Sequence, residues 1–201
     1  MLSNLNERLE HIPRKLIELA IKDEKREIFG AWNHQYILNP CLSKKEVAQF
    51  EAEHNIQLPT DYRAFLLQVG NGGAGPNYGM YRLDKCLDQL GVVRANAHPE
   101  RPFPHTKRWS AWYQLQCEQE RHDYGLIVLS DEGCGMTSVL IVSGAEKGHV
   151  WKDDRANNGE IFPLCLDTKP NAESFYGTSK KDRLSFLDWY EHWLNKSLAF
   201  S

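Results

Sequence analysis

The 201-residue sequence contains no uninterrupted apolar run that approaches the roughly 20 residues a membrane-spanning helix requires. Its first 20 residues mix acidic and basic side chains with a proline, so the apolar core of a signal peptide is missing there. Both absences argue against a membrane protein and against export. We therefore expect a protein of the cytoplasm that makes no contact with a membrane.

An excess of positive charge is also absent. The sequence has 24 Lys and Arg residues against 27 Asp and Glu residues, for a net charge of -3. Such a chain has no global positive field to attract a phosphate backbone, so we expect no direct binding of nucleic acid. One basic and aromatic stretch, residues 94–113, allows stacking on single-stranded nucleic acid, but contact with a protein or packing on the domain fits an acidic chain better. The basic and aromatic residues of this stretch include Arg101, Lys107, Arg108, Trp109 and Trp112.

Paired metal-binding or redox cysteines are missing too. The number of cysteines is odd, and their spacing contains no C-x-x-C pair. Histidines do not form H-x-x-x-H or H-E-x-x-H, and the glycines at 72–75 follow a helical pattern, whereas a phosphate-binding P-loop precedes a helix. We expect reduced thiols, no metal and no cofactor. The five cysteines are Cys41, Cys86, Cys117, Cys134 and Cys165.

The most informative stretch that is present covers residues 55–76. An apolar stripe at i, i+3, i+4 and i+7 predicts a helix with one buried face; its members are Tyr62, Phe65, Leu66 and Val69. Pro59 suits the first turn of this helix. Glycines that tolerate positive φ then end the helix, and a proline prevents it from resuming; these are Gly70, Gly72, Gly73, Gly75 and Pro76.

Three other segments have helical patterns. Residues 2–25 carry a stripe that Pro13 interrupts, which predicts two helical pieces that the proline separates or kinks; the stripe is Leu9, Ile12, Leu16, Ile17 and Ala20. Ser43 and Glu46 form a capping box that predicts a helix over residues 44–54. A last helix should start near Asp182, and its aromatic face should lie against the sheet; that face contains Phe186, Trp189, Tyr190, Trp193 and Leu194.

Strand patterns fill much of the region between these helices. Residues 124–129 predict a buried strand, residues 130–135 a turn, and residues 137–142 and 149–152 two more strands of an antiparallel meander. Residues 161–164 predict a short edge segment. The whole indicates an α+β fold in a single domain, mainly an antiparallel sheet with helices packed on it.

The stretch with Leu58-Pro59, the amphipathic helix, Gly72-Gly73 and Tyr78-Gly79 closely resembles the SMI1/KNR4 family of the SUKH superfamily. The resemblance implies an SMI1/KNR4-like domain over 29–201, a helical extension at 1–28 and an irregular insertion at about 84–122. Most family positions should be scaffold. Carried over residue by residue, they are Leu58, Pro59, Tyr62, Phe65, Leu66, Gly72, Gly73, Gly75, Pro76, Tyr78, Gly79, Asp131, Gly133, Gly135, Gly148 and Trp151.

The resemblance implies a non-enzymatic recognition domain with a protein partner. Many bacterial members look like immunity proteins that bind and neutralise cognate toxins, often nucleases, and fungal members are linked to regulation of cell-wall synthesis. A toxin inhibitor would occlude the active surface of the toxin, with acidic loops facing a basic surface. A regulatory or scaffold protein without a toxin is the alternative.

Six residues are candidates for partner binding. Tyr78, Tyr81, Asp131 and Glu132 are chosen for a ligand-facing surface. Asp153 and Asp154, expected just after the third strand, would join the acidic pair in a negative patch if the turns converge; ordinary solvated loop charges are the competing interpretation. The excursion at 84–122 leaves open whether the usual face is accessible.

A small hydrolase is a remote alternative. Cys134 between two glycines would be its nucleophile, with His122 or His149 as base and Asp131 as the orienting group. The sequence has no G-x-S-x-G elbow and no known cysteine-protease signature around this position. A tight turn between two strands is the simpler interpretation, so no catalytic residue is assigned.

Overall fold

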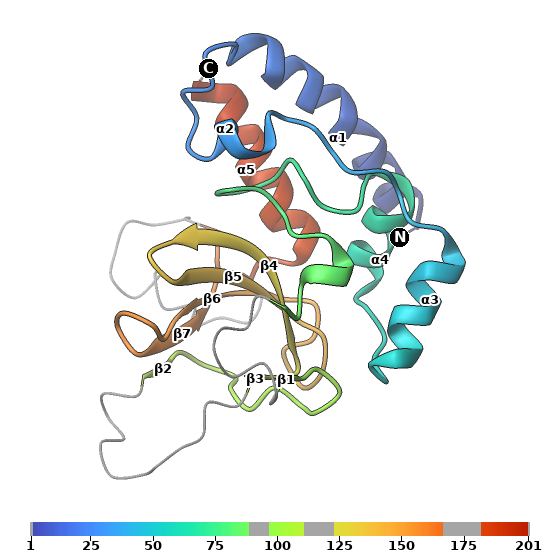
Figure 1. The fold of residues 1–201 in the computed structure, drawn as a ribbon, viewed down its shortest axis with the longest axis vertical. Coiled ribbons are helices and arrows are strands. Elements are labelled where there is room, and N and C mark those ends of the chain that lie inside the picture. Colours follow the sequence, from blue (N-terminus) through green and yellow to red (C-terminus); the bar gives the residue numbers. More distant parts are fainter. Residues whose placement is uncertain (1, 89–96, 111–122, 167–181, 201) are drawn as a thin grey trace.

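A five-stranded antiparallel sheet, in the order β2-β7-β6-β5-β4, carries helices packed on one face (Figure 1). The computed structural model describes residues 2–88, 97–110, 123–166 and 182–200. The helices are α1 (Leu2–Lys22), α2 (Ala31–His34), α3 (Lys44–Glu53), α4 (Thr60–Gln68), α5 (Phe186–Phe200) and the 3₁₀ turn η1 (Leu83–Lys85). The strands are β1 (Ala97–His98), β2 (Trp109–Ser110), β3 (Asp123–Tyr124), β4 (Leu126–Gly133), β5 (Met136–Ile141), β6 (Val150–Asp154) and β7 (Glu160–Pro163). The predicted α+β single-domain fold is confirmed.

Both faces of the sheet are buried. Alternate residues of the strands face the helical core, among them Ile127, Leu129, Leu140 and Val150. The other residues face a second apolar cluster, among them Leu126, Val128, Val139, Ile141 and Trp151. Phe103 covers this second face and lies edge-on to the Trp151 ring at 4.9 Å. The described part of the expected insertion therefore closes one face of the sheet.

The turn predicted for residues 130–135 is wrong in extent. β4 continues to Gly133, because Ser130 and Asp131 pair with Ser138 and Thr137 of β5 on either side of irregularities in the ladder. The tight turn is confined to residues 133–135, which all have positive φ, between 53° and 88°. β6 likewise runs to Asp154, so the four acidic candidates lie on strands and not on loops.

The prediction of an edge segment at residues 161–164 is also wrong in part. β2 pairs with β7 through Trp109–Ile161 and Ser110–Glu160, so β7 lies between β6 and β2. Pro163 lies beyond these two pairs, where its missing N–H breaks no ladder bond to β2.

The helices at 44–53 and 60–68 form as predicted. Ser43 and Glu46 make the full capping box of α3. Pro59 directly precedes α4, and the predicted stripe residues Tyr62, Phe65 and Leu66 are completely buried. Short-range signals are sufficient for both helices.

The separation of the first helix at Pro13 is wrong, since α1 is one helix from Leu2 to Lys22. Leu9 and Ile12 before the proline and Leu16 after it are buried in the same core, so packing holds the two halves in one helix. Ile17 was assigned to the buried stripe, but it is 63% exposed, and Leu19 is the buried residue. α1 contributes to the main core. The division of the chain into a helical extension at 1–28 and a domain at 29–201 stays a prediction.

The last helix starts at Phe186, later than the predicted Asp182. Residues before it are extended: the Leu184 N–H donates to the Leu164 carbonyl, and the Leu184 carbonyl accepts the Val150 N–H, both at 2.9 Å. Most of the predicted aromatic face is buried, with Phe186 and Tyr190 completely inaccessible, but Trp193 is only partly buried. The rings of Phe186 and Tyr190 contact Phe65 of α4, so this face packs against a helix as well as facing the core of the sheet. Arg8 of α1 binds Asp188 and Glu191 of this helix, each at 2.6 Å.

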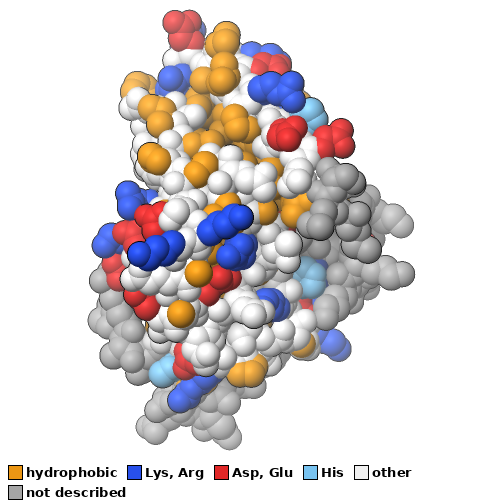
Figure 2. Space-filling model, turned by 90° about the vertical axis from the view of Figure 1, so that its right-hand side faces the viewer, with side chains coloured by type: hydrophobic (Ala, Val, Ile, Leu, Met, Phe, Trp, Pro, Cys, Tyr) orange, Lys and Arg blue, Asp and Glu red, His pale blue; other side chains and the backbone are white. Residues whose placement is uncertain are grey.

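The side of the molecule that carries α3 and α4 mixes charges of both signs. Figure 2 shows acidic and basic side chains interspersed in its lower half, and hydrophobic side chains gathered in its upper half. This face therefore shows no broad field of one sign.

Candidate functional site

Three chain segments extend the sheet beyond β4. Isolated antiparallel bridges join Leu38 to Gly73, Gly73 to Met80, and Met80 to Ser130 of β4. Backbone bonds of 2.9 Å and 2.7 Å connect Gly73 and Met80 in both directions. The segments around residues 38, 73 and 80 thus form a small platform continuous with the sheet.

Glycine is required where these segments meet. Gly73 has φ +96°, and a Cβ there would lie 2.4 Å from the carbonyl oxygen of Ile37. Gly79 has φ +95°, and its Cβ would lie 2.6 Å from the Gly73 carbonyl oxygen. A side chain at either position would push the backbones apart.

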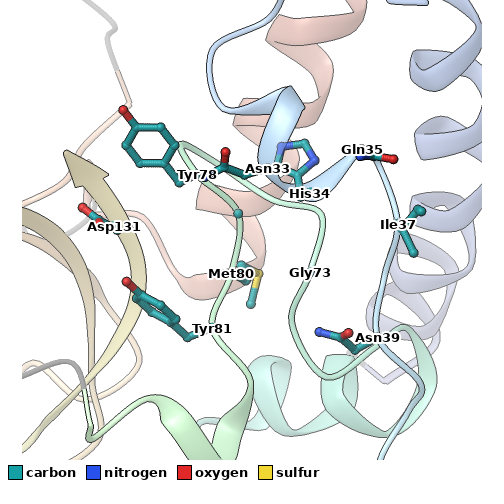
Figure 3. A pocket seen from close by; sticks show the side chains of 11 residues that line it. Asn33, His34, Gln35, Ile37, Asn39, Gly73, Tyr78, Met80, Tyr81 and Asp131 are labelled. Carbon is teal, nitrogen blue, oxygen red and sulfur yellow. The ribbon is translucent and has the colours of Figure 1, made fainter. Parts of the chain in front are cut away.

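A groove of about 810 Å³ lies on this platform (Figure 3). It is lined by Asn33, His34, Gln35, Ile37, Asn39, Gly73, Tyr78, Gly79, Met80, Tyr81 and Asp131. The lining comes from both sides: residues 33–39 form one wall, and the loop at 78–81 with β4 forms the other. Figure 3 shows Asp131 on β4 at a level between the rings of Tyr78 and Tyr81.

Two exposed apolar side chains, Ile37 and Tyr78, line this groove, and others lie close to them in the chain. Of the eight large apolar side chains that are exposed among the described residues, four belong to the segment 29–37 or to the facing Tyr78: Phe29, Trp32, Ile37 and Tyr78. The rings of Phe29 and Tyr78 are in contact, with centroids 4.9 Å apart. Ile37 lines the groove and is 65% exposed. Apolar side chains clustered on a surface are typical of a binding site.

The structure brings three of the six predicted partner-binding residues together. Tyr78, Tyr81 and Asp131 line the same groove. Glu132, the next residue in β4, lines a different cavity of about 360 Å³ between the sheet and α5. There it accepts a hydrogen bond from Ser138 and pairs with Lys152 at 2.8 Å.

Asp153 and Asp154 do not line the groove. Asp153 pairs with Arg155 at 2.6 Å. Asp154 is buried, and its two carboxylate oxygens accept hydrogen bonds from Asn157 and Asn158. Both carboxylates stabilise the turn after β6, so their role in folding explains their positions and no binding protein is needed to account for them.

Asp131 differs from these acidic residues. Its Oδ1 accepts the Gly133 N–H at 2.7 Å, and its carbonyl accepts the Tyr78 N–H at 3.2 Å. None of the Lys and Arg residues that the structure describes forms an ion pair with it. Burial, followed by the negative charge of Asp131, raises the pKa of Tyr81, so Tyr81 presents a neutral phenol beside the carboxylate.

His34 is a buried residue of the groove wall that the sequence did not reveal. Its Nδ1 accepts the backbone N–H of Tyr36 at 3.1 Å. Burial, and then the charge of Arg26, lower the pKa of His34 from 6.5 to about 4. The imidazole is therefore neutral at pH 7 and adds no charge to the groove.

The wall at residues 33–39 is anchored to the end of α1. The Tyr36 hydroxyl donates to Asp23 Oδ2 at 2.5 Å, and Asp23 also accepts the N–H groups of Glu27 and Ile28. Burial raises the pKa of Asp23, but these hydrogen bonds outweigh it and the pKa is lowered. A signal that could have drawn attention to this part of the chain is the group of aromatic residues Phe29, Trp32 and Tyr36, since aromatic residues are common in interfaces.

The family positions divide between the buried core, turns of the sheet and the backbone around the groove. Leu58, Tyr62, Phe65 and Trp151 are buried. Pro76 accepts a hydrogen bond from Ser130, and a Cβ on Gly75 would lie 2.7 Å from Met80. Gly133 faces the Tyr78 ring, Gly72 lies against the Tyr81 carbonyl, and Gly135 and Gly148 have positive φ at turns. Pro59 precedes α4.

The geometry does not assemble the hydrolase alternative. Cys134 is exposed in the turn between β4 and β5. His149 precedes β6 at the opposite end of the sheet, where Val150 pairs with Leu140. His122 lies outside the described residues. Across the described parts of the chain, no three His, Cys, Asp or Glu side chains are grouped as metal ligands would be.

The two arginines that the structure describes in the basic, aromatic stretch contact other side chains of the domain, whereas Lys107 is exposed. Arg101 donates to the Tyr124 hydroxyl and lies over its ring. Arg108 pairs with Glu160 and lies over the Phe162 ring. Trp109 stacks on His105 with centroids 5.2 Å apart. Trp112 lies outside the described residues. The described part of this stretch therefore packs on the domain.

None of the helices in the described ranges has the length and the apolar content needed to traverse a bilayer. No curated protein and no solved structure matches the chain. A family model, described as the SMI1 / KNR4 family (SUKH-1), matches residues 41–179. That range includes the amphipathic helix α4, the platform segments around residues 73 and 80, and the strands of the sheet. The chain belongs to the SMI1/KNR4 family.

Proposed function

We propose that the chain is a non-enzymatic protein-binding domain, an immunity-type protein of bacterial kind that binds a cognate toxin. The groove at Tyr78, Tyr81 and Asp131 carries this proposal, because exposed apolar residues gather around it on a backbone fixed by the sheet. A nuclease is the leading class of toxin. The domain neutralises the toxin by covering its active surface.

The composition of the surface supports a protein ligand. Aromatic residues such as Phe29 and Trp32 are common anchors of protein interfaces, since they bury a large area at a small cost in side-chain entropy. The platform is connected to β4 by backbone hydrogen bonds, which preorganise it and lower the entropy lost on binding. We place the binding in the cytoplasm, in line with the free thiols of Cys41, Cys86 and Cys134.

Co-expression tests this function. A cell that produces the toxin encoded beside the gene should stop growing, and it should grow again when the present chain is produced with it. The two proteins should also purify together. Absence of both rescue and complex formation would overturn the immunity function and favour the alternative, a regulatory or scaffold protein of the SMI1/KNR4 type.

The same assay separates binding from catalysis. Cys134→Ala removes the nucleophile of the hydrolase alternative and changes an exposed side chain. We expect this variant to rescue growth as well as the original chain. Loss of rescue together with unchanged complex formation would favour an enzyme.

A further inference from the structure

One of the four acidic candidates differs from the others in the groups that bind its carboxylate. Glu132 and Asp153 are neutralised by Lys152 and Arg155. Asp154 is buried and occupied by two asparagine side chains. The Asp131 carboxylate alone among these four has no cation or side-chain donor in the described chain, and it accepts only the backbone N–H of Gly133.

The surroundings of Asp131 would suit a cation. The other residues that line the groove have neutral side chains at pH 7, since the pKa of His34 is about 4. Asp131 therefore gives the groove a negative charge that no residue of its lining balances. The tyrosines on each side along the groove, Tyr78 and Tyr81, present aromatic rings, whose faces attract cations.

We propose that the groove binds an arginine side chain of the partner protein. The guanidinium pairs with the Asp131 carboxylate and stacks on a ring of Tyr78 or Tyr81, and an apolar residue beside the arginine packs on Ile37. Arginine fits better than lysine, because its planar head can stack and form a directed hydrogen bond at the same time. This inference deepens the proposed function and rests on it for the nature of the partner.

Part of the groove lies outside the range of the family match. Five of the eleven residues that line the groove, Asn33, His34, Gln35, Ile37 and Asn39, precede residue 41, where the matched range begins. The wall that receives the apolar neighbour of the arginine therefore lies outside the matched range.

A titration with dipeptides tests whether the groove binds an arginine side chain, and it does not require the partner protein. The probes are N-acetyl-leucyl-arginine amide and N-acetyl-leucyl-citrulline amide, which have similar shapes but differ in charge. Backbone amide signals of the full-length chain are followed by NMR up to about 10 mM probe, a range suited to weak ligands. We expect saturable shifts at residues 37, 78–81 and 131, with affinity for the arginine probe about fivefold higher than for the citrulline probe.

Two variants at neighbouring positions test whether the charge of Asp131 causes the preference for arginine. Asp131→Asn keeps an oxygen for the Gly133 N–H but removes the charge, so it should abolish the preference for arginine. Glu132→Gln removes the adjacent charge, which is already paired with Lys152, and should leave the preference unchanged. Equal affinity for the two probes, an unchanged preference in Asp131→Asn, shifts located elsewhere, or no shifts would each overturn the inference.

The outcomes separate this inference from the proposed function. If the chain neutralises the toxin but fails the dipeptide test, the cationic occupant is wrong and the immunity function stands. If the chain passes the dipeptide test but neither rescues growth nor binds the toxin, the groove recognises arginine in some other protein and the immunity function is wrong.

Discussion

Ser130 Oγ donates a hydrogen bond to the carbonyl oxygen of Pro76 at 2.8 Å, with Ser130 completely buried. This bond connects the edge strand of the sheet to the loop that carries Tyr78. The position of the aromatic wall of the groove thus depends on a residue that sequence patterns assigned to a turn.

Ser130→Ala should destabilise the fold by about 1–3 kcal/mol, because it leaves the Pro76 carbonyl without its donor in a buried place. Urea unfolding measures the loss. Ser143→Ala is the control, since the Ser143 hydroxyl is exposed and makes a longer 3.3 Å bond. Equal losses in the two variants would contradict the anchoring role of Ser130.

Gly73→Ala should destabilise the chain more than Gly148→Ala. Both glycines have φ near +95°, at +96° and +94°, so alanine meets similar backbone strain at both sites. Only at Gly73 does the new Cβ meet backbone, 2.4 Å from the Ile37 oxygen; at Gly148 the nearest atom is 3.9 Å away. Strain accounts for about 1 kcal/mol at each site, and the clash adds to it at Gly73. Thermal unfolding of the pair gives the difference, and similar melting temperatures would argue against close packing of this wall.

Tyr36→Phe removes the hydrogen bond to the Asp23 carboxylate and should cost about 1.5–3 kcal/mol at pH 7. The pKa of Asp23 is lowered from 3.8, so its ionised form stabilises the fold above that pH. The difference between wild type and variant should therefore shrink as the pH falls through the folded-state pKa. Tyr78→Phe, at an exposed tyrosine, should change stability by less than about 0.5 kcal/mol at any pH. A pH-independent difference for Tyr36→Phe would show that the charge of Asp23 is not involved.

His34→Asn should weaken the pH dependence of folding stability in the acidic range. The pKa of His34 falls from 6.5 to about 4 in the folded state, so the unfolded chain binds more protons between these values and stability declines as the pH drops from 6.5 to 4. Asparagine can still accept the Tyr36 N–H but does not titrate. His105, with a pKa also lowered to about 4, keeps its own share of the slope. Denaturant midpoints at several pH values measure the slope, and an identical slope in the variant would contradict a buried neutral His34.

Local signals were sufficient for part of the fold. The capping box at Ser43 and Glu46 and the stripe from Tyr62 to Val69 depend on residues a few positions apart, and α3 and α4 form where they predict. Pro13 shows the limit of such signals. Its cost to the helix is local, but the burial of Leu9 and Leu16 on either side is a tertiary effect that overrides it.

The groove was predictable from one side only. Tyr78, Tyr81 and Asp131 were selected from the sequence, whereas the wall at 33–39 was not, because it reaches the groove through the bridge between Leu38 and Gly73. No short-range pattern records that pairing. The length of β4 was missed for the same reason, since Ser130 and Asp131 are polar and join the strand only through their partners in β5.

The most direct test of the account is the affinity of the purified chain for the toxin encoded beside its gene, measured by calorimetry for Ile37→Asp and Ile21→Asp. The two isoleucines are similarly exposed, at 65% and 73%, but only Ile37 lines the groove. We predict that Ile37→Asp weakens binding by at least about 100-fold, as expected for an anchor residue, while Ile21→Asp binds like the wild type. Unchanged affinity in Ile37→Asp, or equal losses in both variants, would contradict the assignment of the groove as the binding surface.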